Sequence, residues 1–456
     1  MKNLSLTYCT NVHPLGEWAA WSDLIGRFGP AVRKVLAWEN LPLGLWFPAS
    51  LIAEMNRDPE ASRERLKALL SDNRLSAFTC NAFPYGNFHD RTVKTKVYHP
   101  DWTTPERLAY TVACARLLAA LTPEGGEGSV STLPLGWRIG WNEERSRHAA
   151  EQLCAFVRQA RAIAEVQGRT IRLGLEPEPG CALETIEQVI GFWDAHLRPA
   201  AARAGISSGD LDAHLGLCYD TCHQAIQFED PIDVLERLKA AGIAVVKMQL
   251  SSGLVFQPDP DRTTLDLRRQ FVEERFLHQT RVRTPAGILC FDDLPEALAA
   301  HHGVSGAIGG IPHGATAAST SGNPNRASSA GNAHGVDLWA HAWRVHYHLP
   351  IDSQSLLGSA GSANAIATTR DDMLKAYHYA VAKGLCRHFE IETYTWSVLP
   401  EALRPKDDGE LARSLAGEIA FIVAQTPAGV LINGSVTAGP GPAVMDPGGP
   451  ANQEAE

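Results

Sequence analysis

Apolar and polar residues alternate in the segment His214-Leu215-Gly216-Leu217-Cys218-Tyr219-Asp220-Thr221-Cys222-His223. Successive side chains of a β-strand point to opposite faces, so Gly216, Cys218 and Asp220 share one face and apolar side chains occupy the other. The pattern predicts a buried strand that ends in reactive side chains.

The same pattern recurs in three other parts of the chain. It is seen in Leu173-Gly174-Leu175-Glu176-Pro177-Glu178, Val345-His346-Tyr347-His348-Leu349 and Phe389-Glu390-Ile391-Glu392-Thr393-Tyr394. Strands that lie so far apart in the sequence can bring these side chains together only if their sheet curls around a common centre. This is the arrangement at the mouth of a parallel barrel.

Strand-like and helix-like segments alternate along nearly the whole chain. The strand-like segments are 3–10, 43–47, 75–83, 128–135, 171–178, 214–220, 243–251, 343–350 and 388–395. The helix-like segments are 17–39, 50–70, 104–122, 142–167, 183–203, 230–241, 368–384 and 408–425. This cadence predicts parallel pairing, because parallel strands need long crossovers.

No phosphate-binding GxGxxG follows the first strand, so we expect an α/β fold of the (β/α)8 TIM-barrel type rather than an open doubly wound sheet. About nine strands are more than an eight-stranded barrel needs. Either 43–47 or 343–350 is therefore expected to be an extra strand at one end of the barrel.

We expect a single TIM-barrel domain over residues 1–430 with one flexible insertion at 302–335, which is low in complexity and rich in Gly, Ala, Ser and Asn. The histidines in and beside this insertion are expected to be solvated rather than metal-bound; they are His301, His302, His313 and His334. A tail rich in Gly and Pro, residues 431–456, is expected to be disordered.

Composition excludes several functional classes. The chain has 456 residues, of which 45% are hydrophobic and 20% charged, and a formal net charge of -10. An acidic chain without a basic tract is a poor candidate for binding nucleic acid.

No run of about 20 apolar residues could span a bilayer, and no apolar leader segment is seen. The nine cysteines are scattered without a CxxC pair, so we expect a protein of the reducing cytoplasm.

Several strand ends carry side chains that bind divalent metals. Asp220 and His223 are natural ligands, although Asp220 could instead cap the next helix while His223 packs against it. Glu176 and Glu178 share one face and would be costly inside a barrel unless a cation neutralised them; Glu178 could alternatively lie beyond the barrel in solvent. His346 and His348 share a strand face and could complete the coordination set.

Other polar residues are candidates for catalysis or for binding a substrate. Glu392 is a candidate ligand or general base. Lys247 could pair with Glu178, orient a substrate oxygen or neutralise an enolate, or it could form an internal salt bridge. The remaining candidates for substrate binding are Gln249, Asn11, His13, Asn81 and Tyr394.

The segment Gly216–His223 resembles the Asp-Thr-x-His strand end of the xylose-isomerase-like TIM-barrel superfamily, and Leu175-Glu176 and Ile391-Glu392-Thr393 resemble its strand-end glutamates. The resemblance implies that Glu176, Asp220 and Glu392 hold a divalent metal, most readily zinc or manganese. In the isomerase and epimerase branch such glutamates also act as acid and base. His223, His346 and His348 would correspond to a separate zinc site of the nuclease branch.

Three positions depart from the pattern of that superfamily. Gln249 stands where both branches usually have a metal-binding histidine, and Asn81 and Thr132 stand where the nucleases have further histidines. These departures, together with the acidic charge, argue against a trinuclear zinc nuclease.

Longer segments resemble the EboE-type metabolite-traffic proteins of the same superfamily. They are Phe83-Pro84-Tyr85-Gly86, Tyr98–Arg107, Ser131–Gly136 and Glu390–Trp396. This resemblance implies a role in making or moving a small metabolite, with other proteins of the same pathway as partners.

The expected function is a metal-dependent isomerase or epimerase that acts on a small polyhydroxylated or carbonyl metabolite. Glu176 and Glu392 would exchange a proton, assisted by Lys247. A non-catalytic scaffold that binds a metabolite or a partner is the alternative, and a metal-assisted hydrolase is a third hypothesis.

Overall fold

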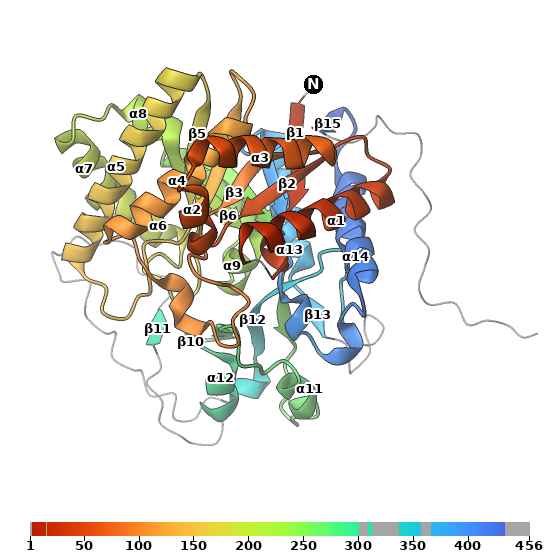
Figure 1. Ribbon diagram of the computed structural model, residues 1–456. Helices are drawn as coiled ribbons and strands as arrows, with labels where there is room; N and C mark the ends of the chain where they lie inside the picture. Colours follow the sequence, from red (N-terminus) through yellow and green to blue (C-terminus); the bar gives the residue numbers. More distant parts are fainter. Residues whose placement is uncertain (1, 15, 301–308, 312–336, 357–365, 434–456) are drawn as a thin grey trace, which may run out of the picture.

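A parallel sheet curls into a barrel in the computed structural model, which describes residues 2–14, 16–300, 309–311, 337–356 and 366–433 (Figure 1). The nine-stranded sheet has the order β15-β1-β14-β7-β6-β5-β4-β3-β2. All of these strands except β15 form the barrel: β1 (Lys2–Tyr8), β2 (Leu41–Trp46), β3 (Leu75–Asn81), β4 (Glu127–Thr132), β5 (Thr170–Leu175), β6 (Leu215–Asp220), β7 (Val245–Leu250) and β14 (His388–Ile391).

The barrel is nearly closed between its first two strands. A parallel bridge joins Cys9 to Gly44 at the carboxyl end of this seam. At the other end, β15 (Val430–Asn433) pairs with the first residues of β1. The predicted TIM barrel is confirmed, and segment 43–47 proves to belong to barrel strand β2.

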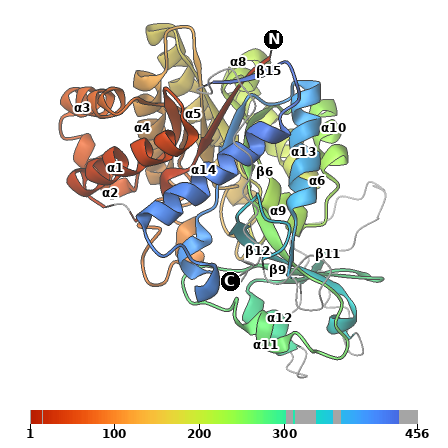
Figure 2. The ribbon, with the colours of Figure 1, turned by 90° about the vertical axis from the view of Figure 1, so that its right-hand side faces the viewer.

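Helices cover the outside of the barrel, as Figures 1 and 2 show. They are α1 (Trp18–Leu36), α2 (Ala49–Met55), α3 (Pro59–Asp72), α4 (Pro105–Leu121), α5 (Glu143–Gln167), α6 (Ile186–Phe192), α7 (Arg198–Arg203), α8 (Ser208–His214), α9 (Thr221–Ile226), α10 (Pro231–Ala240), α13 (Arg370–Lys383) and α14 (Asp408–Gln425). Capping residues fix where several of them begin; the Thr104 side chain, for example, accepts a hydrogen bond from the Arg107 N–H at the start of α4. Among the described residues, no helix combines the length and the hydropathy that a membrane crossing requires.

A second, antiparallel sheet interrupts the barrel between β7 and α13. Its strands have the order β11-β10-β9-β12-β8-β13. The elements of this inserted sheet are β8 (Ser252–Phe256), α11 (Leu265–Arg269), β9 (Thr280–Thr284), β10 (Gly287–Phe291), α12 (Leu294–Ala300), β11 (Gly309–Ile311), β12 (Ala342–Leu349) and β13 (Ala367–Thr368). In Figure 1 it lies below the barrel.

Segment 343–350 is therefore the strand outside the barrel, and it pairs with β8 and β9 of the inserted sheet. Of the low-complexity segment 302–335, all but β11 lies outside the described residues, as does the tail from residue 434 onward. Residues 431–433 do not belong to a disordered tail, because they form β15 on the edge of β1.

A buried ion pair lies inside the barrel. Lys247 Nζ is 2.6 Å from Glu390 Oε2 and donates to Ser131 Oγ at 3.0 Å, and the side chains of Lys247 and Glu390 are fully buried. Burial alone would lower the pKa of Lys247, but the Glu390 carboxylate outweighs it and holds this pKa above its ordinary value. A Cβ on Gly44 would lie 1.8 Å from Glu390 Oε1, so only glycine fits beside this carboxylate.

A buried histidine of β14 should make the stability of the protein depend on pH. The His388 ring packs against Phe78, and its Nδ1 lies 2.9 Å from Ser129 Oγ. Burial lowers the pKa of His388 to about 4. Between this value and the ordinary pKa of about 6.5, the unfolded chain binds the proton and the folded chain does not. The contribution of the neutral His388 ring to the free energy of unfolding is therefore fully present above the ordinary pKa. It is lost as the pH falls toward the pKa of His388 in the folded protein.

We expect His388→Gln to remove this dependence. Urea unfolding at about pH 7 and about pH 4.5 should show wild type losing about 2 kcal/mol more than the variant on acidification. His148→Gln, at an exposed position of α5, is the control and should behave as wild type. Equal losses in wild type and His388→Gln would show that His388 does not titrate in this range.

Candidate metal centre

Three carboxylates meet at the carboxyl ends of β5, β6 and β14. Glu176, Asp220 and Glu392 are buried and offer oxygen atoms that all lie within 4.8 Å of one another. One oxygen of each, namely Glu176 Oε2, Asp220 Oδ2 and Glu392 Oε2, has no hydrogen-bond partner within the described structure. Buried polar atoms are rarely left without a partner, so this carboxylate cluster has the properties of a cation site.

The other oxygens of Glu392 and Asp220 are held by specific partners. Glu392 Oε1 accepts hydrogen bonds from the side-chain amides of Asn11 and Asn81, both at 2.7 Å. Asp220 Oδ1 accepts the backbone N–H groups of Cys222 at 2.7 Å and His223 at 3.1 Å, and so caps α9. Asp220 thus caps the helix with one oxygen and leaves the other toward the carboxylate cluster, which satisfies both interpretations of its sequence position.

Two of the carboxyl groups have raised pKa values. Burial raises the pKa of Glu176 and of Glu392 well above the ordinary value, and the neighbouring carboxylates add to it by repulsion. A divalent ion would offset this repulsion, and carboxylate oxygens suit zinc, manganese and magnesium.

Three histidines form a second cluster next to the first. The Nε2 atom of His223 lies 3.1 Å from that of His346 and 3.3 Å from that of His348, and the last two atoms are 3.0 Å apart. Two nitrogen ligands of one tetrahedral zinc ion lie about 3.3 Å apart at the usual bond length of about 2.0 to 2.1 Å. The spacing of this imidazole cluster therefore fits a single metal ion.

The Nδ1 partners decide which nitrogen of each ring bears the proton. Nδ1 donates to the Pro177 carbonyl at 3.1 Å in His223, to Gln279 Oε1 at 2.6 Å in His346, and to the Glu392 carbonyl at 2.8 Å in His348. Carbonyl oxygens only accept, so each neutral ring presents a lone pair at Nε2. Three lone pairs that face one another are stabilised by a cation, and partners of this kind orient metal-binding histidines.

Two of the imidazoles, His346 and His348, are held in the neutral form that binds metals. Burial lowers the pKa of His348 to about 4 and that of His346 well below its ordinary value. Both rings are therefore uncharged at physiological pH.

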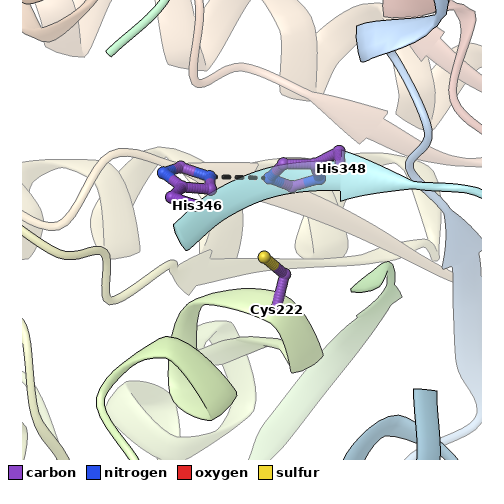
Figure 3. A group of neighbouring side chains, drawn as sticks. All are labelled: Cys222, His346 and His348. Carbon is purple, nitrogen blue, oxygen red and sulfur yellow. Dashed lines mark hydrogen bonds between the residues drawn. The ribbon is translucent and has the colours of Figure 1, made fainter. Parts of the chain in front are cut away.

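A thiol lies against the imidazole cluster. Figure 3 shows Cys222 on α9 with its sulfur toward His346 and His348 on β12. Its Sγ donates to the Tyr347 carbonyl at 3.1 Å, and burial raises the pKa of the thiol well above its ordinary value. A protonated thiol is a poor ligand, so His223 is the better third member of the set.

The two clusters adjoin. Ligand atoms of Asp220, His223 and His348 lie within 4.8 Å of one another, and so do ligand atoms of Glu178, His223 and His346. Glu178 Oε1 accepts the Tyr98 hydroxyl at 2.7 Å, so it lies in the site rather than in solvent. The arrangement could hold two cations, with Asp220 facing both.

A small cavity of about 40 Å³, room for about three water molecules, opens onto both clusters. Among the predicted site residues, those that line it are Glu176, Glu178, His223, His346, His348, Glu392, Asn11, Asn81 and Tyr394. Tyr98, Phe88, Phe276 and Lys94 also line it. Sequence reasoning missed Tyr98, Phe276 and Lys94 as site residues, although Tyr98 lies in a segment that had been singled out.

Four predicted residues do not line this cavity: Asp220, which nevertheless belongs to the carboxylate cluster, and Lys247, Gln249 and His13. Lys247 pairs with Glu390, which is the internal salt bridge left open as an alternative. Lys247 is in register with Cys218, and the pair Asp220 and Gln249 lies one layer nearer the barrel mouth. Lys247 therefore faces inward but lies too deep to reach the mouth. Gln249 Oε1 accepts a hydrogen bond from the Cys218 thiol at 3.0 Å. The His13 ring packs on Phe28 and is not part of the cavity lining.

No family model and no curated protein matches the chain. Among solved structures, it is similar to a xylose-isomerase-like TIM-barrel protein from Mycobacterium smegmatis in complex with magnesium, with 11% identity, a TM-score of 0.46, and coverage of 92% of this chain and 97% of that chain. A D-tagatose 3-epimerase-like protein shows 12% identity, a TM-score of 0.42, and coverage of 92% and 99%. The IOLI protein with a bound zinc atom shows 12% identity, a TM-score of 0.33, and coverage of 54% and 72%.

Similarity at this level shows neither a family nor a function for this chain. The expected TIM barrel is confirmed as an architecture by the order of the strands. The resemblance to EboE-type proteins stays a prediction.

Proposed function

We propose that the chain is a metal-dependent enzyme that moves a proton beside a carbonyl group of a small metabolite, as an isomerase or epimerase. The observation that carries the proposal is the set of three buried carboxylates, each with one oxygen left without a partner toward a common centre. A cation bound there would polarise substrate oxygens.

Glu176 and Glu392 are the groups proposed to transfer the proton. Both line the cavity, and a carboxylate within reach of the substrate carbon can accept a proton and, once protonated, return it. One carboxylate would accept the proton from the substrate carbon and the other would return one. The amides of Asn11 and Asn81 fix the orientation of Glu392 for this task.

The imidazole cluster supports a second candidate, metal-assisted hydrolysis. Cations in both clusters would allow one to supply a bound water as nucleophile while the other holds the substrate. The resemblance to metabolite-traffic proteins supports a small metabolite precursor as the substrate, and other proteins of its pathway as partners, in either case.

Metal analysis of protein purified without chelator tests the proposal. We expect bound zinc or manganese, with an additional equivalent if the imidazole cluster is also filled. His348→Gln should remove the metal of the imidazole cluster, because it deletes one of three lone pairs, and should leave the carboxylate cluster loaded. His378→Gln, on α13 away from both clusters, is the matched control.

Incubation of the loaded protein with small hydroxycarbonyl compounds in D2O then separates the hypotheses. Deuterium incorporation at carbon supports proton transfer, and cleavage of ester or phosphate bonds without such exchange supports hydrolysis. A protein that takes up no zinc, manganese or magnesium on dialysis would contradict both, and would favour the non-catalytic scaffold.

A further inference from the structure

We infer that the substrate is apolar apart from one pair of adjacent oxygen atoms, and is not a polyhydroxylated sugar. The inference rests on the proposed function and concerns the same cavity. It departs from the polyhydroxylated substrate that was one of the sequence-based expectations.

One side of the cavity is aromatic and aliphatic. Phe88, Phe276 and Tyr394 contact one another, with ring centroids 4.9 Å apart for the two phenylalanines and 4.7 and 5.3 Å from these to Tyr394. Phe83, Val97 and Leu277 extend this apolar wall. The ligand clusters supply the polar half of the lining, and these residues supply the apolar half.

The amides that line the cavity are already engaged with Glu392. The side-chain amides of Asn11 and Asn81 both donate to Glu392 Oε1 at 2.7 Å. Asn81 Oδ1 accepts the backbone N–H of Phe83 at 2.9 Å. The Asn81 amide uses its second N–H on Cys9 Sγ at 3.8 Å, whereas Asn11 keeps one N–H that is not used on Glu392.

The other polar groups of the lining are engaged as well. The Tyr98 hydroxyl donates to Glu178 and accepts from Gln279 Nε2 at 2.9 Å. Lys94 Nζ donates to Asp293 Oδ2 at 2.6 Å, to the Phe276 carbonyl at 2.6 Å and to the Glu273 carbonyl at 3.2 Å, which uses all three of its protons. Among the described lining residues outside the metal ligands, this leaves two side chains with free polar groups: Asn11, through Oδ1 and one N–H, and the Tyr394 hydroxyl.

Free polar groups on only two side chains cannot provide hydrogen-bond partners for all the hydroxyl groups of a sugar. Each hydroxyl buried without a partner costs about 1 to 3 kcal/mol, so a chain of hydroxyls against the apolar wall is disfavoured. A compact α-hydroxycarbonyl compound or α-hydroxy acid presents two adjacent oxygens to the cation and carbon to the wall. This class fits both halves of the cavity.

A matched pair of acids tests the inference by calorimetric binding to metal-loaded protein. 2-Hydroxyisovalerate and threonate share the α-hydroxycarboxylate head and differ in whether the remaining carbons are apolar or hydroxylated. We expect 2-hydroxyisovalerate to bind at least about 10-fold more tightly. Phe276→Ser should abolish this preference without changing the metal content, whereas Phe421→Ser, on α14 away from the cavity, should preserve it.

Phe276→Leu guards against a folding defect, because it keeps an apolar wall and should keep most of the preference. Any one of three results would overturn this inference without touching the proposed function. They are equal or tighter binding of threonate, a preference that survives Phe276→Ser, and no binding of either acid to the metal-loaded protein. Failure to take up metal at all would instead overturn the proposed function.

Discussion

Asp220→Asn will abolish tight metal binding at the carboxylate cluster while leaving α9 folded. Asn caps helices as well as Asp does, so the Oδ1 contacts to Cys222 and His223 can persist. The neutral amide replaces the partnerless Oδ2 and removes one negative charge from the ligand set. We expect affinity for zinc or manganese to fall at least about 100-fold, measured by competition with a metal-sensitive dye.

The control for this variant is Asp230→Asn. Asp230 caps α10 through the N–H groups of Ile232 and Asp233 at 3.0 and 3.1 Å, but it is exposed and remote from the metal ligands. It should bind metal as wild type does. Stability without metal gives a second check, because Asp220→Asn relieves repulsion among buried carboxylates and should not lower the free energy of unfolding of the metal-free protein. Undiminished affinity in Asp220→Asn would show that Asp220 only caps the helix.

Glu392→Gln is expected to reduce turnover about 10³-fold, within the usual contribution of a general acid or base. The glutamine oxygen can still accept from Asn11 and Asn81, so the side chain should keep its place. What is lost is the second oxygen, with its charge and its capacity to carry a proton. The readout is deuterium incorporation into an α-hydroxycarbonyl substrate in D2O, with metal content measured on the same sample.

Glu418→Gln is the matched control for Glu392→Gln. Glu418 is fully buried, burial raises its pKa well above the ordinary value, and its Oε1 accepts the Thr393 hydroxyl at 2.6 Å, directly beside Glu392. It does not line the cavity. Glu418→Gln should therefore keep full turnover. Full turnover in Glu392→Gln would refute its proton-transfer role, and loss of turnover together with metal would assign it to ligation.

Much of the barrel could be predicted because its strands follow simple rules. Alternation in Leu215–Asp220 and Thr170–Leu175 marks one buried face, and the polar residues that follow each strand mark the mouth of the barrel. Glu176, Asp220, His223 and Glu392 were therefore found from sequence, and the structure brings them together.

Alternation does not report depth along the barrel axis. Lys247 and Gln249 have the same parity, but the partner of Lys247 is Glu390, on a neighbouring strand whose register no local pattern reveals. The sequence could only leave the salt bridge open as one alternative.

Apart from β12, which matches the predicted segment 343–350, the strands of the inserted sheet were missed for a different reason. In β9 the buried residue Arg281 is charged, and it is paired with Glu184 at 2.6 Å. A charge at a buried position hides the strand pattern until its partner is known. The six residues of α9 are likewise too few to show helical periodicity.

The imidazole cluster draws one ligand from α9 of the barrel and two from β12 of the inserted sheet. An ion bound there links two parts of the chain that hydrogen bonds alone would otherwise hold together, and its binding free energy is shared with their association. Removal of the ion would then weaken the attachment of the inserted sheet to the barrel mouth, although packing contacts such as the hydrogen bond from Cys222 on α9 to Tyr347 on β12 would remain.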